Sequence, residues 1–283
     1  MLCRGNKQIF KIKKMKIAIL YICTGPYSKL FSDFYETANE HLLSGKALLT
    51  YFVWTDTDEF NRWANVKVYP HKCMGFPLDS LFRFEMFLEA KDDLKNFDYI
   101  YFFNANAKFI EDVGYEILPD DSGLACRIWK NPVNNPMFYC IEKDKHSTAY
   151  VPPYDGPYLN YSGGINAGTY AAFLKMTEEL AKNIRTDWNN GIIAKAHDQS
   201  HLNHYFHYHK CKIITHDYCM PGEMVTDNDH PKIIFRPKKD RDFNKKTQKN
   251  QWQHIKSRAK YLLEGISWYL KISVRSGEEK YIR

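Results

Sequence analysis

One stretch of the sequence decides the fold: Asp98-Tyr-Ile-Tyr-Phe-Phe-Asn-Ala-Asn-Ala107. Its residues 99–103 form an unbroken run of aromatic and β-branched side chains, which is typical of a central strand buried on both faces. The run stops at Asn104-Ala105-Asn106, where two carboxamides flank a small residue. In open α/β sheets, ligands bind just outside the carboxyl ends of the strands. The two asparagines therefore occupy a position where function is expected, although asparagine also favours ordinary turns.

The segments before this stretch alternate between strand and helix patterns. Their spacing predicts strands at 16–23, 48–55 and 66–69 and helices at 32–43 and 78–94. This order predicts an α/β fold with a parallel sheet of the nucleotide-binding type. Later in the chain we expect strands at 123–129, 211–215 and 232–236 and helices at 170–184 and 197–208.

The composition favours one catalytic domain with basic ends. A chain of 283 residues with 44% hydrophobic and 16% aromatic residues can bury a sizeable core. Seven cysteines without a Cys-x-x-Cys pair argue against a disulfide framework or a zinc site, and for a reducing compartment. No apolar run reaches 18 residues, and the N-terminus has no long apolar core of a secretory signal.

The charge is concentrated at the two ends of the chain. Residues 1–17 carry six Lys/Arg and no acid, and residues 236–283 carry fourteen Lys/Arg against five acids, which leaves −8 on residues 18–235. An acidic body argues against a nucleic-acid-binding domain. We expect a basic extension at 1–15, a catalytic domain at 16–240 and a basic amphipathic tail at 241–283. A helix expected at 251–272 could pack on the domain or lie on an anionic membrane surface, and the sequence leaves both open.

A glycine cluster follows at Gly163-Gly164-Ile-Asn166-Ala-Gly168. Closely spaced glycines let the backbone approach a ligand where side chains would collide. For the glycine pair alone, a turn between a strand and a helix is the simpler interpretation. The cluster matches neither the G-x-x-x-x-G-K-[ST] phosphate loop nor the dinucleotide fingerprint G-x-G-x-x-G after the first strand.

A polar cluster follows at His197-Asp198-Gln199-Ser200-His201. His197 and His201 stand four residues apart, a spacing that zinc ligands on one helix face can have. The sequence shows neither an intervening Glu of the H-E-x-x-H kind nor an evident third ligand. A capped surface helix is the alternative of comparable weight.

Together these clusters resemble family 6 glycosyltransferases, which include the blood-group A and B transferases, the α-1,3-galactosyltransferases and shorter bacterial relatives. The resemblance runs from about Lys16 to Lys238. It rests on the stretches Phe34-Tyr-Glu-Thr-Ala38, Tyr51-Phe-Val-Trp-Thr-Asp56, Leu81-Phe-Arg-Phe-Glu-Met-Phe87, Glu116-Ile-Leu-Pro119, Ser147-Thr-Ala-Tyr-Val-Pro152, Tyr161-Ser-Gly-Gly164 and Asn190-Gly-Ile-Ile-Ala-Lys-Ala-His-Asp-Gln-Ser-His-Leu-Asn203. It implies a GT-A fold and a UDP-sugar donor.

The resemblance also implies roles for individual residues. It places Ile22, Cys23 and Tyr27 in a uridine pocket with Asp56 nearby, and Arg83 at the donor sugar or phosphates. It places Ser162, Gly163 and Gly164 around the donor sugar, Asp198 at the sugar hydroxyls, and Arg236 and Lys238 near the pyrophosphate. Ala196 and His197 fall on the acceptor side, where the match to the family is weaker.

Two departures from the family pattern shape the expected mechanism. Asn104 and Asn106 stand where the animal enzymes have metal-binding aspartates, and bacterial relatives share these amides, so the resemblance implies a reaction without a divalent metal cofactor. Gln199 stands where the family has a Glu, which disfavours double displacement and leaves a front-face retaining route.

The function implied is retaining α-1,3-type transfer of galactose or N-acetylgalactosamine from a UDP-sugar to an oligosaccharide or lipid-linked glycan. It would serve bacterial surface polysaccharide or lipopolysaccharide synthesis in the cytoplasm, with a peripheral contact at the inner membrane face as an open alternative. The competing hypothesis is a catalytically silent nucleotide-sugar or glycan-binding protein.

Overall fold

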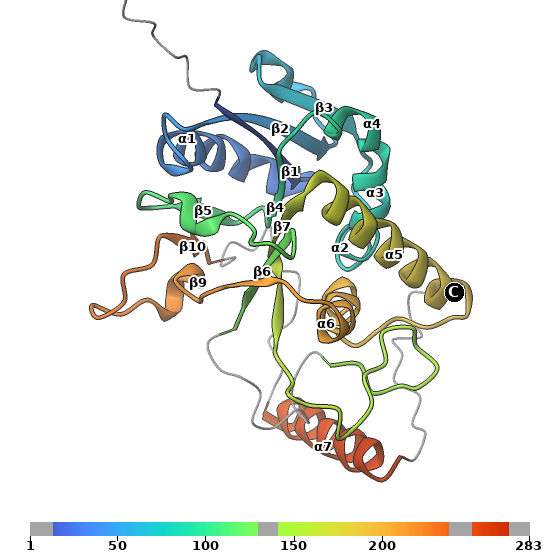
Figure 1. Cartoon of the computed structure of the whole chain (residues 1–283). Coiled ribbons are helices and arrows are strands. Elements are labelled where there is room, and N and C mark those ends of the chain that lie inside the picture. The colour runs from blue at the N-terminus through green and yellow to red at the C-terminus, as the bar shows by residue number, and fades with distance from the viewer. Residues whose placement is uncertain (1–13, 130–140, 238–250, 272–283) are drawn as a thin grey trace, which may run out of the picture.

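A seven-stranded sheet forms the centre of the computed structural model, which describes residues 14–129, 141–237 and 251–271 (Figure 1). The strands follow the order β3-β2-β1-β4-β7-β6-β8. Their bounds are β1 (Met15–Ile22), β2 (Ala47–Thr55), β3 (Val66–Pro70), β4 (Tyr99–Phe103), β6 (Leu124–Ile128), β7 (Tyr161–Thr169) and β8 (Lys212–Ile214). The first four strands pair in parallel, which confirms the predicted nucleotide-binding half. β7 runs antiparallel to both β4 and β6.

A second, three-stranded sheet has the order β5-β10-β9. Its strands are β5 (Ala107–Phe109), β9 (Tyr218–Pro221) and β10 (Ile233–Phe235). The sequence pattern predicts β10 but neither β5 nor β9, although β10 is no longer than they are. Pairing of β10 with β5 brings the end of the body next to the segment that follows β4.

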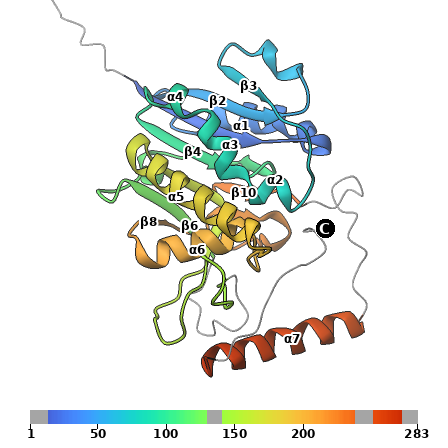
Figure 2. The ribbon, with the colours of Figure 1, turned by 90° about the vertical axis from the view of Figure 1, so that its right-hand side faces the viewer.

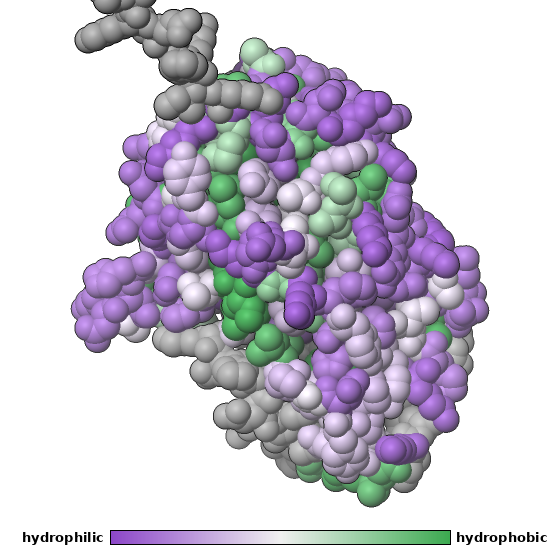
Figure 3. Space-filling model, in the orientation of Figure 1, coloured by the Kyte–Doolittle hydropathy of each residue, from purple (hydrophilic) through white to green (hydrophobic). Residues whose placement is uncertain are grey.

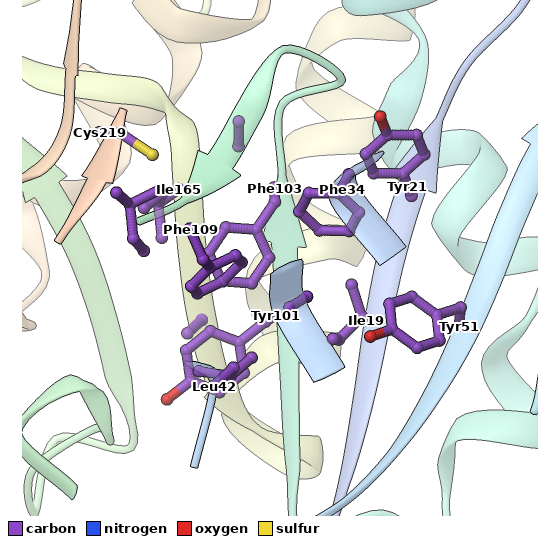
Figure 4. Close-up of a cluster of buried hydrophobic side chains, with 14 of the residues drawn as sticks. Ile19, Tyr21, Phe34, Leu42, Tyr51, Tyr101, Phe103, Phe109, Ile165 and Cys219 are labelled. Atoms are coloured by element: carbon purple, nitrogen blue, oxygen red, sulfur yellow. The ribbon is translucent and has the colours of Figure 1, made fainter. Parts of the chain in front are cut away.

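Helices cover both faces of the large sheet (Figure 2). Alternation along β1 sends Ile17, Ile19 and Tyr21 into one core with α1 and the small sheet, which Figure 4 shows from within. Ala18 and Leu20 face the other core, which α3, α5 and α6 close. Among the described residues outside 78–94, the helices are α1 (Phe31–His41), α5 (Tyr170–Asn189), α6 (Asp198–Tyr208) and α7 (Gln251–Tyr269), with short 3-10 turns at Gly25–Leu30, Glu59–Arg62, Tyr115–Ile117 and Gly222–Met224.

The single helix predicted at 78–94 is wrong in one respect. The structure has three short helices there, α2 (Leu78–Leu81), α3 (Arg83–Glu89) and α4 (Lys91–Leu94). The chain leaves helical geometry at Phe82 and Ala90, where ψ is 12° and 4°. Both residues are buried in the second core, so their packing competes with a straight helix.

α7 packs on the body through one face. Trp268 is 2% exposed, and its indole Nε1 donates a hydrogen bond to the carbonyl of Val151 at 2.8 Å. This confirms the packing interpretation of the tail helix for that face, while the domain boundaries predicted at 15 and 240 stay predictions. None of the helices within the described ranges is long and apolar enough to cross a bilayer. The cysteines of those ranges are free thiols, as expected: Cys23, Cys73, Cys126, Cys211 and Cys219.

Candidate active site

The carboxamide pair after β4 forms a turn that joins the two sheets. The amide of Ala107 donates to the carbonyl of Asn104 at 2.9 Å, so the turn interpretation of this stretch is correct for the backbone. The side chains add more: Asn104 Nδ2 donates to Asn106 Oδ1 at 3.1 Å, and Asn106 Nδ2 donates to the carbonyl of Arg236 at 2.8 Å. The Arg236 amide returns a bond to the Asn106 carbonyl at 2.8 Å. Below the turn, the buried hydroxyl of Tyr21 donates to the carbonyl of Ala105 at 2.6 Å.

The glycine pair lies inside β7, so the predicted turn between strand and helix is wrong at this point. The amide of Asn104 donates to the carbonyl of Gly164 at 2.9 Å, which holds β7 beside the end of β4. A Cβ on Gly164 would lie 2.2 Å from Cζ of Phe235, so packing against β10 requires this glycine. A Cβ on Gly163 would instead lie 3.3 Å from Asp198 Oδ2. The two glycines therefore face different neighbours.

Arg83 connects β7 to the start of α6. Its guanidinium donates to the carbonyl of Gly163 at 2.6 Å and to Asn166 Oδ1 at 3.1 Å, and its Nε lies 3.1 Å from Asp198 Oδ2. The group lies over the ring of Phe102 and is 3% exposed. Burial lowers the pKa of Arg83, and the carboxylate of Asp198 opposes that shift. The contacts of Arg83 are thus to protein groups, and contact with a donor stays a prediction.

α6 begins at Asp198 after a strained residue. His197 has φ 55° and ψ −128°, a backbone conformation that residues other than glycine rarely adopt. Asp198 is 8% exposed; burial raises its pKa, while Arg83 and His197 oppose the rise. Asn203 fixes the helix to β7, because its side chain bonds both the amide and the carbonyl of Tyr161 at 2.9 and 3.0 Å. This pairing holds Asp198 toward Gly163.

Gln199 lies next to Asp198 and points toward the same glycine. Its Nε2 donates to Asn160 Oδ1 at 3.4 Å, and its Oε1 lies 3.7 Å from the position of a Cβ on Gly163. The bond to Asn160 turns the amide so that its oxygen, which can stabilise positive charge, faces Gly163. The half-buried side chain therefore offers a neutral acceptor at this point.

The predicted uridine residues gather at the ends of β1 and β2. Ile22 ends β1, and Cys23 follows it fully buried, so burial raises the pKa of its thiol. Tyr27 lies half-buried in the 3-10 turn that follows. Both carboxylate oxygens of Asp56 accept from the amide of Gly25, at 2.9 and 3.0 Å, which shapes this turn. A nucleoside contact by these residues stays a prediction.

Arg236 lies beside the carboxamide turn, where the resemblance places the pyrophosphate. Its guanidinium pairs with Asp33 at 2.5 Å and donates to the carbonyl of Leu30 at 3.1 Å. Lys108 pairs with the other oxygen of Asp33 at 3.0 Å. These contacts gather two cations and one acid next to Asn106. Lys238 lies outside the described residues.

The acceptor-side predictions fall on the loop before α6. The amide of Ala196 donates to the buried hydroxyl of Ser200 at 3.0 Å. The ring of His197 lies 5.1 Å from that of Phe76, which is 60% exposed and lies in the loop before α2. The sequence interpretation did not select Phe76. An aromatic residue in a polar, glycine- and proline-containing loop is the signal that could have found it.

The zinc alternative gains no support from the geometry. His201 is 2% exposed and lies 3.7 Å from Asp187, whereas His197 lies outside the helix at its start. Burial lowers the pKa of His201 to about 3. Across the described ranges, no three His, Cys, Asp or Glu side chains come together as ligands for a metal ion.

Comparison with known proteins identifies the family. The model of "Glycosyltransferase family 6" matches residues 6–245. The chain belongs to glycosyltransferase family 6. It is 33% identical over 230 residues to the O-antigen biosynthesis glycosyltransferase WbnI of Escherichia coli, covering 79% of this chain and 95% of that protein.

Animal members of family 6 are more distant. The histo-blood group ABO system transferase 1 of Rattus norvegicus is 25% identical over 248 residues, covering 78% of this chain and 65% of that protein. The globoside alpha-1,3-N-acetylgalactosaminyltransferase 1 of Homo sapiens is 25% identical over 231 residues, covering 75% and 63%. The observed α/β sheet agrees with the GT-A-like single domain expected for this family.

In this family 6 fold, hydrogen bonds and one ion pair link part of the predicted site directly. Asn104, Gly164, Gly163, Arg83 and Asp198 form one continuous chain of contacts across β4, β7, α3 and α6. Ser162 joins it through its buried hydroxyl, which accepts from the amide of Gly164 at 3.2 Å. The uridine group around Asp56 has separate contacts at the ends of β1 and β2.

The sequence interpretation assigned no role to three residues that complete the site: Asn160, Asn166 and Asp33. Asn166 is fully buried within a strand pattern, and a polar residue in such a run is a signal for a buried hydrogen-bond partner. Asn160 and Asp33 carry no comparable signal, because their partners Gln199 and Arg236 lie far away in the sequence.

Proposed function

We propose that this family 6 glycosyltransferase is a retaining α-1,3-type enzyme. It moves galactose or N-acetylgalactosamine from a UDP-sugar to an oligosaccharide or lipid-linked glycan in bacterial surface polysaccharide or lipopolysaccharide synthesis. The observation that carries the proposal is the placement of Gly163 against both Asp198 and Gln199, beside the carboxyl end of β4. A sugar ring needs such a bare stretch of backbone next to hydrogen-bonding groups.

The known roles of two relatives support the choice of substrate class. The E. coli relative is an O-antigen biosynthesis glycosyltransferase, and the human relative is an alpha-1,3-N-acetylgalactosaminyltransferase. The bacterial relative covers most of this chain, so we extend its role in O-antigen biosynthesis to the proposed acceptor. We place the enzyme in the cytoplasm, at the inner membrane face.

The proposed chemistry is a front-face displacement. The bond between the anomeric carbon and the diphosphate oxygen breaks, and its electron pair leaves with UDP. The acceptor oxygen bonds to the anomeric carbon from the same face, and its proton passes to the departing phosphate oxygen. The amide oxygen of Gln199 stabilises the positive charge that develops on the sugar, since preorganised dipoles act strongly in a site that excludes water. Asp198, held by Arg83, binds sugar hydroxyls.

The residues after β4 do not fit a divalent metal, although animal relatives with aspartates there would suggest one. Amide oxygens are weaker ligands than carboxylates for hard cations. Asn106 Oδ1 already accepts from Asn104, and Asn106 Nδ2 is bonded to the Arg236 carbonyl. We propose that the leaving diphosphate is instead neutralised by Arg236 and Lys238, through charge-assisted hydrogen bonds.

The test is turnover of UDP-galactose and UDP-N-acetylgalactosamine with a panel of galactosides, in EDTA and in manganese. Equal rates in both are expected, and strict dependence on manganese would overturn the metal-free mechanism. Gln199→Ala should lower transfer at least a hundredfold, about 2.7 kcal/mol of transition-state stabilisation. Asn39→Ala, an exposed amide on α1, is the matched control. An unchanged rate in Gln199→Ala would remove this residue from the mechanism.

The competing function is a silent nucleotide-sugar or glycan-binding protein. It is motivated by the three amides Asn104, Asn106 and Gln199 in place of acids. Calorimetry with each UDP-sugar, run beside a hydrolysis assay, separates the two: binding without hydrolysis or transfer favours the silent protein. Gln199→Glu adds information, because a gain of activity would show that the carboxylate is what the chain lacks.

A further inference from the structure

We propose that α7 docks the enzyme on a bilayer that contains anionic lipids, through a face that we call the outer face of α7. Its members are exposed apolar side chains: Leu262, Leu263, Ile266 and Leu270, with exposures of 43%, 64%, 43% and 64%. Their spacing of one, three and four residues places them on one side of the helix. Figure 3 shows hydrophobic surface gathered at the bottom of the view, where α7 lies in Figure 1.

The opposite face of α7 packs against the body. These contacts hold the helix in one orientation, with its outer face toward solvent. Glu264 is 7% exposed, and its carboxylate pairs with Lys195 Nζ at 2.9 Å. The same ammonium lies 4.0 Å above the ring of Tyr261. Together with buried Trp268, these contacts orient the helix. A tail that merely completed the core would not need apolar side chains on its solvent side.

The charge around the outer face matches an anionic surface. Lys256 and Lys260 are exposed and stand four residues apart on α7, and exposed Lys271 follows the end of the helix. Glu264 is the single acid in residues 251–271, and its carboxylate lies between Lys195 of the body at 2.9 Å and Lys260 of the helix at 3.8 Å. A second copy of the chain on this face would bring these lysines toward each other in a symmetric dimer. A membrane with anionic headgroups attracts them instead.

Docking through α7 would also set the direction of the active site. Lys195, the partner of Glu264, stands directly before Ala196 and His197 at the loop that leads to Asp198. The surface that meets the lipid and the loop that carries the catalytic groups are therefore one contact apart. For the use of a lipid-linked acceptor, the inference rests on the proposed function. Lipid binding itself needs no transfer, so the two can fail separately.

The test is flotation of the full chain with vesicles of phosphatidylglycerol and phosphatidylethanolamine, against vesicles of phosphatidylcholine alone. Binding to the anionic vesicles is expected, with loss at high salt. Leu263→Glu should lower the partition coefficient at least tenfold, since a large exposed apolar side chain is lost from the interface. Lys256→Glu, at an exposed lysine of the same helix, should lower it about fivefold or more, since each basic residue near an anionic surface contributes about 1 kcal/mol.

Matched controls keep the outcome clear. Leu48→Glu changes a leucine on β2 that is 53% exposed, and Lys182→Glu changes an exposed lysine on α5; both should bind as the unchanged chain does. Donor hydrolysis and thermal unfolding report whether each variant folds. Equal binding by Leu263→Glu and the unchanged chain would overturn the inference. The inference would also be overturned if light scattering showed that the unchanged chain is a dimer, that it binds no vesicles, and that Leu263→Glu makes it monomeric. A second copy of the chain would then be the partner of the outer face.

Discussion

The two adjacent glycines of β7 should respond in opposite ways to the addition of one methyl group. Gly164→Ala would place its Cβ 2.2 Å from the ring of Phe235, more than 1 Å closer than an ordinary contact of roughly 3.4–4 Å. Overpacking of a core position costs about 1–3 kcal/mol. We therefore expect Gly164→Ala to lower the melting temperature by roughly 4–8 °C, at about 2 kcal/mol.

The added methyl group of Gly163→Ala meets no ring as Gly164→Ala does, but it lies against two residues of the proposed active site. Its Cβ would lie 3.3 Å from Asp198 Oδ2 and 3.6 Å from Cβ of Gln199, which a shift of a few tenths of an ångström relieves. The fold should keep its melting temperature within about 2 °C, because Gly→Ala also reduces the entropy of the unfolded chain. The methyl group occupies the space in front of Asp198 and Gln199, so kcat/KM for sugar transfer should fall at least tenfold, about 1.4 kcal/mol.

Thermal unfolding and a UDP-release assay on both variants test this pair. Phe235→Leu in the Gly164→Ala background should recover part of the stability, since it shortens the side chain that the methyl meets. The reasoning is refuted if Gly163→Ala keeps full transfer activity, or if both glycine variants lose the same stability.

Two further predictions concern buried charges. Arg83→Met should lower the free energy of unfolding by about 3–5 kcal/mol, because it leaves buried Asp198 without its cation. In urea denaturation, adding Asp198→Asn should restore at least half of this loss. A double variant no more stable than Arg83→Met would contradict the pairing. Burial lowers the pKa of His201 to about 3 from 6.5, so the unfolded chain takes up a proton as the pH falls through 6.5 while the folded chain does not. The free energy of unfolding should drop by about 2–3 kcal/mol between pH 6.5 and 4.5 from this group, and a pH slope as steep in His201→Leu would refute the assignment.

The parallel half of the fold could be predicted because each strand there is long and carries its own pattern. Residues 99–103 and the flanking segments of β1 and β2 are buried on both faces, so their composition alone indicates a central strand. β5 and β9, of three and four residues, exist only because β10 pairs with both. β5 depends on a partner more than 100 positions away, and β9 depends on a pairing that contains a bulge. A local sequence pattern does not predict either pairing.

The site shows the same division between local and distant causes. The glycine pair resembled a turn, since a run such as Ser-Gly-Gly has little strand propensity. Its strand conformation follows from Phe235, which lies 71 positions after Gly164 and fills the space a side chain would take. Arg83 could be located through family resemblance, but its burial between Asn166 and Asp198 could not, because the sequence does not show which donors a guanidinium uses.

The carboxamide of Asn106 has a consequence for how this chain could change over evolutionary time. Its nitrogen donates to the Arg236 carbonyl, and an aspartate in that place would set oxygen against oxygen at 2.8 Å. Two like partial charges in contact destabilise the junction between the two sheets. Replacement of Asn106 by aspartate would thus weaken the fold before any ion could offset the loss. An acidic residue at position 106 is therefore compatible with this junction only if another group donates to the Arg236 carbonyl.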